Sequence, residues 1–247
     1  MSNSLSQTLH DQTLSALVDR LGLKETHGEA DGPWLPLISQ VPMVQGQIGQ
    51  VRVFEGPGIT RLVSCTIVVP PIGLDSHMLF AFADTESGLP HFTVDSVRNG
   101  ADYAFHLDLI PRLDLAANLA YMDAVFAPLT ETFQAHRDTP GLKPAALDPR
   151  QYAVMSPWML VNRADEAAFK ATFAAVEAYL EHWFGLLSAG VPEAVLGCTS
   201  AQQRAERDAA HRGVIFNAEV DKVWNQISPL IGADTVETLI GLLRNTR

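Results

Sequence analysis

Histidine and aspartate side chains recur between positions 77 and 108, where polar and apolar residues alternate along the chain. Successive side chains of a β-strand point to opposite faces, so an extended run places His91, Thr93 and Asp95 on one face. A carboxylate inside a protein is costly unless it is hydrogen-bonded, paired with a cation or used in proton transfer. Asp95 is therefore our first candidate for general acid chemistry, with His91 beside it.

A metal site is an alternative use of the same region, because two histidines and a carboxylate could hold iron or zinc. The possible ligands, on segments expected to be neighbouring strands, are His77, His91, Asp95, His106 and Asp108. No HxxxH or HExxH spacing accompanies them. Asp108 also has a structural alternative, in which it ties the end of its strand to a following loop.

The elements that must position these side chains are short β-rich segments joined by tight connections. Asn99-Gly100, between two such segments, predicts a hairpin turn because both residues tolerate positive φ. Connections of this length force neighbouring strands to run antiparallel, so we expect a meander sheet. Its strands should cover 47–55, 59–69, 76–83, 91–98 and 102–110. A sixth strand is expected over 152–161, at an edge because Pro157 has no N–H to donate.

The helical periodicity of apolar residues predicts helices before and after the strand region. The expected helices cover 5–21, 115–129, 165–188, 199–217 and 219–243. Gly22 should end the first helix, and Pro128 should kink the second. The segment 24–47 should be a long connection and 138–150 a loop. Helices on both faces predict an α+β fold, a three-layer α/β/α sandwich with a central antiparallel meander sheet.

The chain shows no internal repeat or break in composition, so we expect a single domain over 1–247. Its expected parts are an N-terminal helix and long connection over 1–46, mainly sheet with an inserted helix over 47–161, and helices over 162–247. Hydrophobic residues make up 47% of the chain and charged residues 18%, which is ordinary for a folded protein.

Charge and cysteine content narrow the class of protein. The formal net charge of −11 argues against nucleic acid or an anionic membrane as partner, because both attract basic surfaces. Cys65 and Cys198 are too few and too far apart for a disulfide framework or a CxxC zinc site, which favours a reducing compartment. With no secretory leader and no apolar run of ~20 residues, we expect a cytoplasmic protein without membrane association.

Two groups of motifs resemble a known family over about 75 to 245. The motifs are the run 90–95, Leu107-Asp108-Leu109-x-Pro111-Arg112-x-Asp114-Leu115 with Tyr121, and Arg207-Asp208-Ala-Ala-His211-Arg212-Gly213-Val214 with Trp224. Together they resemble the ferredoxin-dependent bilin reductase superfamily. The Pro-Arg-x-Asp-Leu continuation favours its red chlorophyll catabolite reductase branch over the phycobilin branch.

The resemblance implies an α/β/α sandwich with an open-chain tetrapyrrole between the sheet and the C-terminal helices. It also implies that the protein binds no flavin, nicotinamide or metal of its own. Electrons would come singly from reduced ferredoxin or flavodoxin, and side chains would supply the protons. The absence of a Gly-x-Gly-x-x-Gly motif, a Walker-type loop and a paired CxxC in the sequence agrees with this expectation.

The same resemblance assigns roles to individual residues. Asp95 falls at a strand carboxylate that donates a proton to the bilin, and Asp208 at a second acid on the helical side. His77 lies near the position of a histidine that pairs with the strand carboxylate. Its spacing differs by one residue, which reverses the direction of a strand side chain, so His91 is the alternative. Some bilin reductases carry Lys directly after the second acid, where this chain has Ala209.

Basic residues supply candidates for binding the pigment and its electron donor. The candidates for the pigment are Arg112, Arg163, His211 and Arg212. An arginine can bind a propionate carboxylate through two parallel hydrogen bonds, although it could equally form a surface ion pair. Because ferredoxins are usually acidic, encounter with this acidic chain requires a local basic patch. The residues proposed for that patch are Arg204, Arg207, Arg212 and Lys222.

Three hypotheses about function follow from the sequence. The first is an oxidoreductase that reduces a double bond of a linear tetrapyrrole, such as a red chlorophyll catabolite or another bilin. Its electrons come from ferredoxin, and its protons come from Asp95, Asp208 and a histidine. The second is a carrier or sensor that binds a bilin without chemistry, and the third is a metal-dependent hydrolase or oxygenase. A monomer and a homodimer are both compatible with the sequence.

Overall fold

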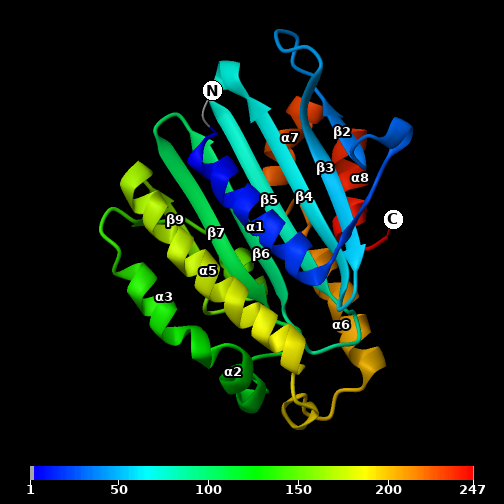
Figure 1. Cartoon of the computed structure of the whole chain (residues 1–247), viewed down its shortest axis with the longest axis vertical. Helices are drawn as coiled ribbons and strands as arrows, with labels where there is room; N and C mark the ends of the chain where they lie inside the picture. The colour runs from blue at the N-terminus through cyan, green and yellow to red at the C-terminus, as the bar shows by residue number, and fades with distance from the viewer. Residues whose placement is uncertain (1–2, 247) are drawn as a thin grey trace.

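The computed structural model describes residues 3–246, and its centre is an antiparallel sheet (Figure 1). The strand order is β1-β3-β4-β5-β6-β7-β9-β8, and β2 also pairs with β3. The strands are β1 (Lys24–Thr26), β2 (Leu35–Ile38), β3 (Gln47–Gly56), β4 (Ile59–Val69), β5 (Leu74–Ala83), β6 (His91–Asn99), β7 (Asp102–Ile110), β8 (Lys143–Pro144) and β9 (Leu160–Ala164). The expected meander of five strands is confirmed as β3 to β7.

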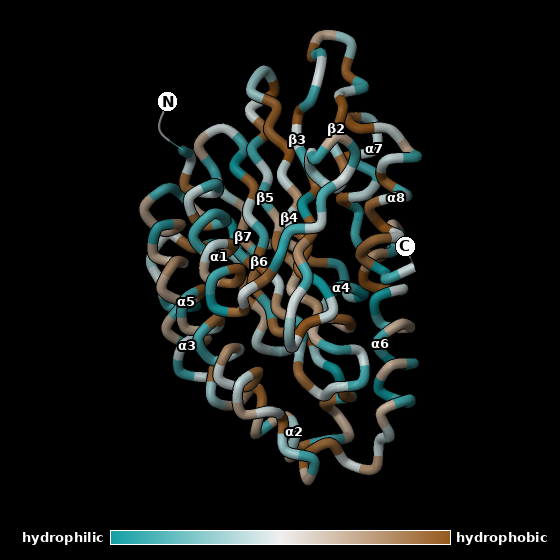
Figure 2. The backbone as a smooth tube through the Cα atoms, turned by 45° about the vertical axis from the view of Figure 1, so that its right-hand side comes forward, coloured by the Kyte–Doolittle hydropathy of each residue, from teal (hydrophilic) through white to brown (hydrophobic). Residues whose placement is uncertain are grey.

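Helices cover both faces of the sheet, as Figures 1 and 2 show. One face carries α1 (Leu5–Leu21), α2 (Leu119–Val125), α3 (Thr130–Arg137) and α5 (Glu166–Ala189). The other face carries α4 (Pro149–Val154), α6 (Ala201–Ile215), α7 (Val223–Ile231) and α8 (Ala233–Leu243). Short 3₁₀ turns occur at η1 (Glu29–Asp31), η2 (Pro70–Ile72), η3 (Ala127–Leu129) and η4 (Glu193–Val195). The α+β fold and its α/β/α layers are confirmed.

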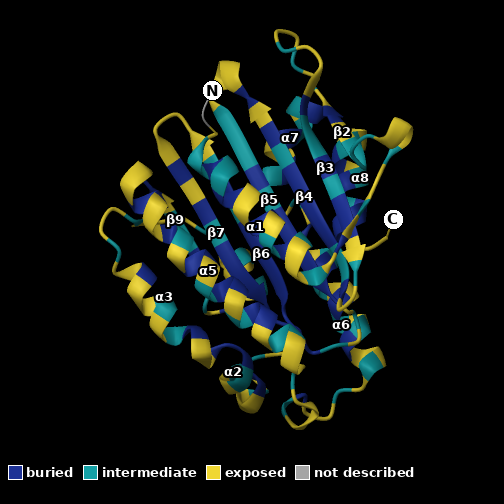
Figure 3. Cartoon of the chain, in the orientation of Figure 1, coloured by how far each residue is buried: buried dark blue, intermediate teal, exposed yellow. Residues whose placement is uncertain are grey.

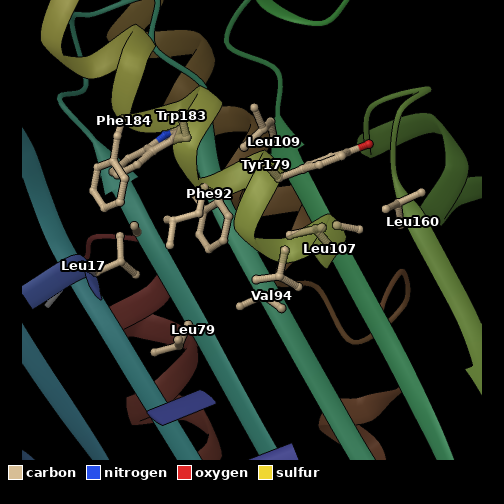
Figure 4. Close-up of a cluster of buried hydrophobic side chains, with 14 of the residues drawn as sticks. Leu17, Leu79, Phe92, Val94, Leu107, Leu109, Leu160, Tyr179, Trp183 and Phe184 are labelled. Carbon is tan, nitrogen blue, oxygen red and sulfur yellow. The ribbon is translucent and has the colours of Figure 1, made fainter. Parts of the chain in front are cut away.

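The face that carries α1 and α5 buries one apolar core (Figures 3 and 4). Leu17 of α1, Phe92 of β6 and Trp183 of α5 are all fully buried there. The indole N–H of Trp183 donates to the carbonyl of Pro90 at 2.8 Å, so the polar end of this large side chain is satisfied. Full burial of a Leu or Phe side chain contributes roughly 1.5–3 kcal/mol to stability. The packing of this core therefore fixes the position of β6.

A second core lies between the sheet and the C-terminal helices. The ring of Phe216, just after α6, meets Phe80 and Phe82 of β5 edge-on at centroid distances of 5.3 and 6.1 Å. Trp224 of α7 packs on the same ring at 6.2 Å. Edge-on aromatic pairs are favourable beyond the area they bury, so this cluster fixes the start of α7 against the sheet.

The hairpin between β6 and β7 sets which side chains meet across the strands. Asn99 pairs with Asp102, so the turn is centred on Gly100 and Ala101, one residue later than the sequence predicted. Gly100 adopts the left-handed conformation with φ of 65°, which costs glycine little. The hairpin itself is confirmed, and its centre is corrected by one residue.

Other expected elements also differ from the structure. The segment 24–47 is more than a connection, because it contains β1 and β2, which are too short to show a periodic pattern. The helix expected over 115–129 is shorter: α2 is followed by a 3₁₀ turn that contains Pro128, and α3, which was not predicted, begins after it. The segment 219–243 is divided into α7 and α8 at Gly232, whose φ is 88°.

The predicted sixth strand is wrong in its first half. Asp148 caps α4 and Pro149 occupies its first position, so the chain is helical up to Val154. The strand proper is β9, which follows Pro157. It is not at the edge, because β8 pairs with its outer side. Within residues 3–246, no helix combines the length and the apolar character that crossing a membrane requires.

Candidate functional site

A cleft of about 280 Å³ lies between the sheet and the C-terminal helices. Side chains of β5, β6, β7 and β9 form its base, and the segments 145–161 and 215–224 form its sides. Most of its lining is apolar, including Met78, Phe80, Met155, Met159, Phe216 and Trp224. The position agrees with the expected location of the pigment, between the sheet and the C-terminal helices.

Asp95 and His106 form an ion pair at the base of the cleft. They are direct partners on β6 and β7, and His106 Nδ1 donates to Asp95 Oδ2 at 2.8 Å. The Asp95 side chain is 28% exposed, so one side of its carboxylate remains open to the cleft. Asp95 thus lies where the sequence placed it, with a histidine partner that the sequence analysis did not assign to it.

The charged form of His106 is stabilised by the carboxylates around it. Burial disfavours an imidazolium, but the hydrogen bond to Asp95 and the charges of Asp95, Asp108 and Asp221 outweigh burial and raise the pKa of His106. A protonated His106 beside Asp95 gives the cleft a proton store in direct contact with a carboxylate. This arrangement is suited to general acid catalysis.

Asp221 faces the same cleft from the connection between α6 and α7. Its carboxylate accepts a hydrogen bond from the backbone N–H of Val223 at 3.0 Å. Burial raises the pKa of Asp221, and the negative charge of Asp95 raises it further. Asp221 was not among the site residues predicted from the sequence. One signal was present, because Lys222 follows Asp221 directly, which is the pattern described above for the second acid.

Asp108 is buried behind the Asp95–His106 pair and does not line the cleft. It accepts hydrogen bonds from the backbone N–H and the hydroxyl of Ser156, at 2.9 and 2.5 Å. Burial raises the pKa of Asp108 to about 7. The interpretation that Asp108 ties its strand to a following loop is confirmed.

His91 and Asp208 belong to a different, fully buried cluster. Asp208 Oδ1 lies 2.6 Å from His91 Nε2, and its carboxylate lies 3.4 Å from Arg112 Nε and 3.6 Å from Arg212 Nη1. The backbone N–H of Ala83 donates to His91 Nδ1 at 3.0 Å, so His91 carries its proton on Nε2 and donates it to Asp208. The four side chains of the cluster are His91, Asp208, Arg112 and Arg212.

The electrostatics of this cluster correct the role assigned to Asp208. Burial would raise the pKa of its carboxyl, but His91 and the two arginines lower it to about 2. Burial and the charge of Arg112 lower the pKa of His91 to about 3. At neutral pH Asp208 therefore has no proton to give and His91 is uncharged. Neither residue lines the cleft, so Asp208 and His91 belong to a structural network between β6 and α6.

Three of the four candidates for binding the pigment also lie outside the cleft lining. The Arg112 guanidinium donates to the carbonyls of Asp84, Thr85 and Leu89, and so holds the loop before β6. Arg212 donates Nε to the carbonyl of Leu243, and its guanidinium lies 3.8 Å above the ring of Phe82. His211 Nε2 donates to the carbonyl of Val154 at 2.8 Å.

Arg163 of β9 is the candidate that the structure places in the cleft. It is exposed, and its register partner on β8 is Lys143, which is also exposed. Like charges directly opposite one another on neighbouring strands repel. Neither cation has an ion pair with any other residue in the described part of the chain. This edge of the cleft is therefore suited to an anionic group of a ligand.

His77 lies on the wrong face of the sheet to meet Asp95. It is buried beneath α1, where Nε2 lies 2.5 Å from Asp75 Oδ1 and its ring lies 5.3 Å from that of His10. The one-residue offset reverses its direction, as the period of a strand requires. Both predicted partners of Asp95, His77 and His91, are therefore wrong, because His106 occupies that position.

Only part of the basic patch proposed for the electron donor lies at the surface. Arg204 is buried and donates to the carbonyls of Glu86 and Thr199, while Arg207 donates to those of Pro111 and Leu113. Arg212 is buried as described, and Lys222 is paired with Glu219. Burial removes Arg204 and Arg212 from the surface, whereas Arg207 is half-buried and Lys222 is exposed.

The possible metal ligands are also dispersed. His77 is on the opposite face, His91 is bound to Asp208, and Asp108 is bound to Ser156. Among residues 3–246, no group of three or more histidine, cysteine, aspartate or glutamate side chains is arranged to hold a metal ion. Asp95, His106 and Asp221 instead interact with one another at the cleft.

Comparison with known proteins supports the fold. No family model and no curated protein matches the sequence. Among solved structures, the chain is similar to phytochromobilin synthase from tomato, crystallised in complex with biliverdin, with a TM-score of 0.76 and 22% sequence identity. The match covers 97% of this chain and 82% of that chain. The chain has the fold of that protein. The fold implied by the sequence resemblance is thereby confirmed.

Proposed function

We propose that this protein is an oxidoreductase that reduces a double bond of a linear tetrapyrrole. The observation that carries the proposal is the Asp95–His106 pair at the base of an apolar cleft. The cleft lies in a fold shared with a protein whose structure contains biliverdin. A flat, apolar pigment packed over Asp95 would exclude water, which favours the protonated form of a carboxyl group and transfer of its proton.

The dimensions of the cleft bear on how a pigment would bind. Its volume of about 280 Å³ lies near the lower end of the ~300–1,000 Å³ range of ligand sites. A tetrapyrrole would therefore fill the cleft with its central part and extend past the mouth. Arg163, with Lys143 opposite it on β8, would bind a propionate carboxylate there.

Reduction of one double bond adds two electrons and two protons to the pigment. We assign the protons to Asp95, recharged by His106, and to Asp221 on the opposite side of the cleft. The electrons come one at a time from an external donor, for which the sequence resemblance implies reduced ferredoxin or flavodoxin. No intrinsic cofactor is required by this assignment, and the residues of the cleft supply only binding, exclusion of water and protons.

The substrate and the branch of the superfamily form a finer part of the proposal. The Pro-Arg-x-Asp-Leu motif favours a red chlorophyll catabolite, whereas the structural neighbour binds biliverdin. In this structure Arg112 of that motif holds the loop before β6, so the motif acts on the pigment only indirectly. Both pigments therefore belong in the test.

An anaerobic titration tests the function. Biliverdin and a chlorophyll-derived bilin are added to the protein in turn, with and without reduced ferredoxin, while absorption spectra are recorded. We expect a spectral shift on binding and loss of the conjugated band of one pigment after ferredoxin is added. Binding without reduction would indicate a carrier or sensor, and absence of binding would overturn the proposal altogether.

A further inference from the structure

Asp108 is a buried carboxylate that the proposed reaction does not use. It is 0% exposed and shares a face of β7 with His106, two residues along the strand. Residues two apart on a strand are separated by about 6.6 Å, close enough for a strong interaction between buried charges. Ser156 fixes the carboxylate with two hydrogen bonds, and such bonds favour its ionised form.

Three carboxylates surround His106, whose neighbour on β9 is the apolar Val161. Asp95 faces it from β6, Asp108 from its own strand and Asp221 from the connection between α6 and α7. His106 Nδ1 is bound to Asp95, while Nε2 is buried without a hydrogen-bond partner among residues 3–246. The charge on the imidazolium therefore depends on these three carboxylates. Asp108 is the one that a bound pigment cannot touch.

We propose that Asp108 is a positioning residue for proton transfer, whose carboxylate, held by Ser156, keeps His106 protonated behind Asp95. Its role in turnover rests on the proposed function, but its effect on His106 does not. In this arrangement Asp95 hands its proton to the ligand and regains one from His106. Asp108 remains out of contact with the ligand and balances the charge on the imidazolium.

The pH dependence of Asp108 suits this role. Burial raises its pKa to about 7, so it becomes negatively charged as the pH rises through neutrality. That is the range in which an ordinary histidine loses its proton. The appearance of the Asp108 charge thus opposes loss of the proton from His106, and extends the pH range in which His106 can recharge Asp95. Tyr179 of α5 also lies near Asp108 and stays neutral in this range, because burial raises its pKa.

NMR titration of His106 in the ligand-free protein tests the inference. The resonance is assigned by its absence in His106→Gln, and wild type is compared with Asp108→Asn. We expect the variant to shift the balance between protonated and neutral His106 about tenfold or more towards the neutral form. Thr93→Val is the matched control, because Thr93 is the register partner of Asp108 and its buried hydroxyl has no hydrogen-bond partner among the described residues.

Ser156→Ala provides a second variant in case Asp108→Asn does not fold. It keeps the carboxylate but removes one of its donors, so Asp108 should ionise at higher pH and His106 should lose its proton at lower pH than in wild type. An unchanged His106 titration in whichever of the two variants folds would overturn the inference. So would an equal shift in Thr93→Val.

The pH profile of pigment reduction separates this inference from the proposed function. If both hold, the alkaline limb of the kcat/KM profile moves to lower pH in Asp108→Asn and stays in place in Thr93→Val. If the protein reduces no pigment but Asp108→Asn shifts the His106 titration, the proposed function fails and the interaction stands. If reduction occurs with an unshifted profile and an unshifted titration, the inference about Asp108 is wrong.

Discussion

Replacing Asp208 by Asn should destabilise the fold strongly, because Asp208 is the sole carboxylate among the four buried side chains of its cluster. Arg112 and Arg212 are each 1% exposed, and Asp208 is 3% exposed. Asn removes the negative charge that both arginines face, and leaves two buried cations without compensation. Removing one partner of a buried ion pair costs about 3–5 kcal/mol. For a chain of this length, that loss lowers Tm by about 6–20 °C.

The measurement is urea unfolding of wild type, Asp208→Asn and Asp221→Asn, followed by circular dichroism. Asp221→Asn is the matched control, since it also removes one carboxylate but at the cleft, where no buried arginine depends on it. We expect a large loss of stability only in Asp208→Asn. A stable Asp208→Asn variant that binds the pigment and fails to reduce it would refute our reasoning, and would restore Asp208 as a proton donor.

Three further predictions follow from the same geometry. The pKa of His91 is lowered to about 3 from an ordinary value of about 6.5, so its contribution to the free energy of unfolding should be fully present above pH 6.5 and should be lost as the pH falls towards 3. Urea unfolding at several pH values measures this dependence. In His91→Gln the free energy of unfolding should depend less on pH over this range. Arg163→Gln should weaken the binding of a pigment with free propionates about 5-fold and leave the affinity for its dimethyl ester unchanged. Absorption titration measures both affinities, and an equal loss for the two pigments would contradict a contact between Arg163 and a carboxylate. His77→Gln should keep the wild-type kcat per folded molecule, since His77 lies on the opposite face; a loss comparable with that of Asp95→Asn would mean that the sheet faces are misassigned.

Local spacing was sufficient to predict the five central strands, β3 to β7, and to place Asp95 on one face with His91. The alternation in the run 91–95 placed Asp95 on the same face as His91 because the period of a strand is two, and the resemblance implied that this face meets the C-terminal helices. The partner of Asp95 was missed for an equally local reason. A turn centred on Asn99-Gly100 would place Ala104 opposite Asp95, whereas the observed turn, one residue later, places His106 there. A one-residue error in a turn is enough to change which side chains face each other across two strands.

The acids on the helical side could not be distinguished from the sequence. Asp208 and Asp221 both follow the long helix α5, and the spacing within α6 does not show which of its faces meets the sheet. The burial of Asp208 depends on His91, more than one hundred positions earlier in the chain, and on Arg112. Such long-range contacts decide whether a carboxyl group holds or loses its proton, and they are fixed only when the layers pack.

The most direct test of the account is a single-turnover comparison of Asp95→Asn with Asp75→Asn. Each variant removes the carboxylate of an Asp–His pair in the sheet, within β5 for Asp75 and across β6 and β7 for Asp95, but only Asp95 faces the cleft. With reduced ferredoxin and bound pigment under anaerobic conditions, we expect Asp95→Asn to slow pigment reduction about 10²–10⁴-fold with binding retained. Asp75→Asn should react at the wild-type rate. Equal rates for Asp95→Asn and wild type would contradict the assignment of Asp95 as proton donor.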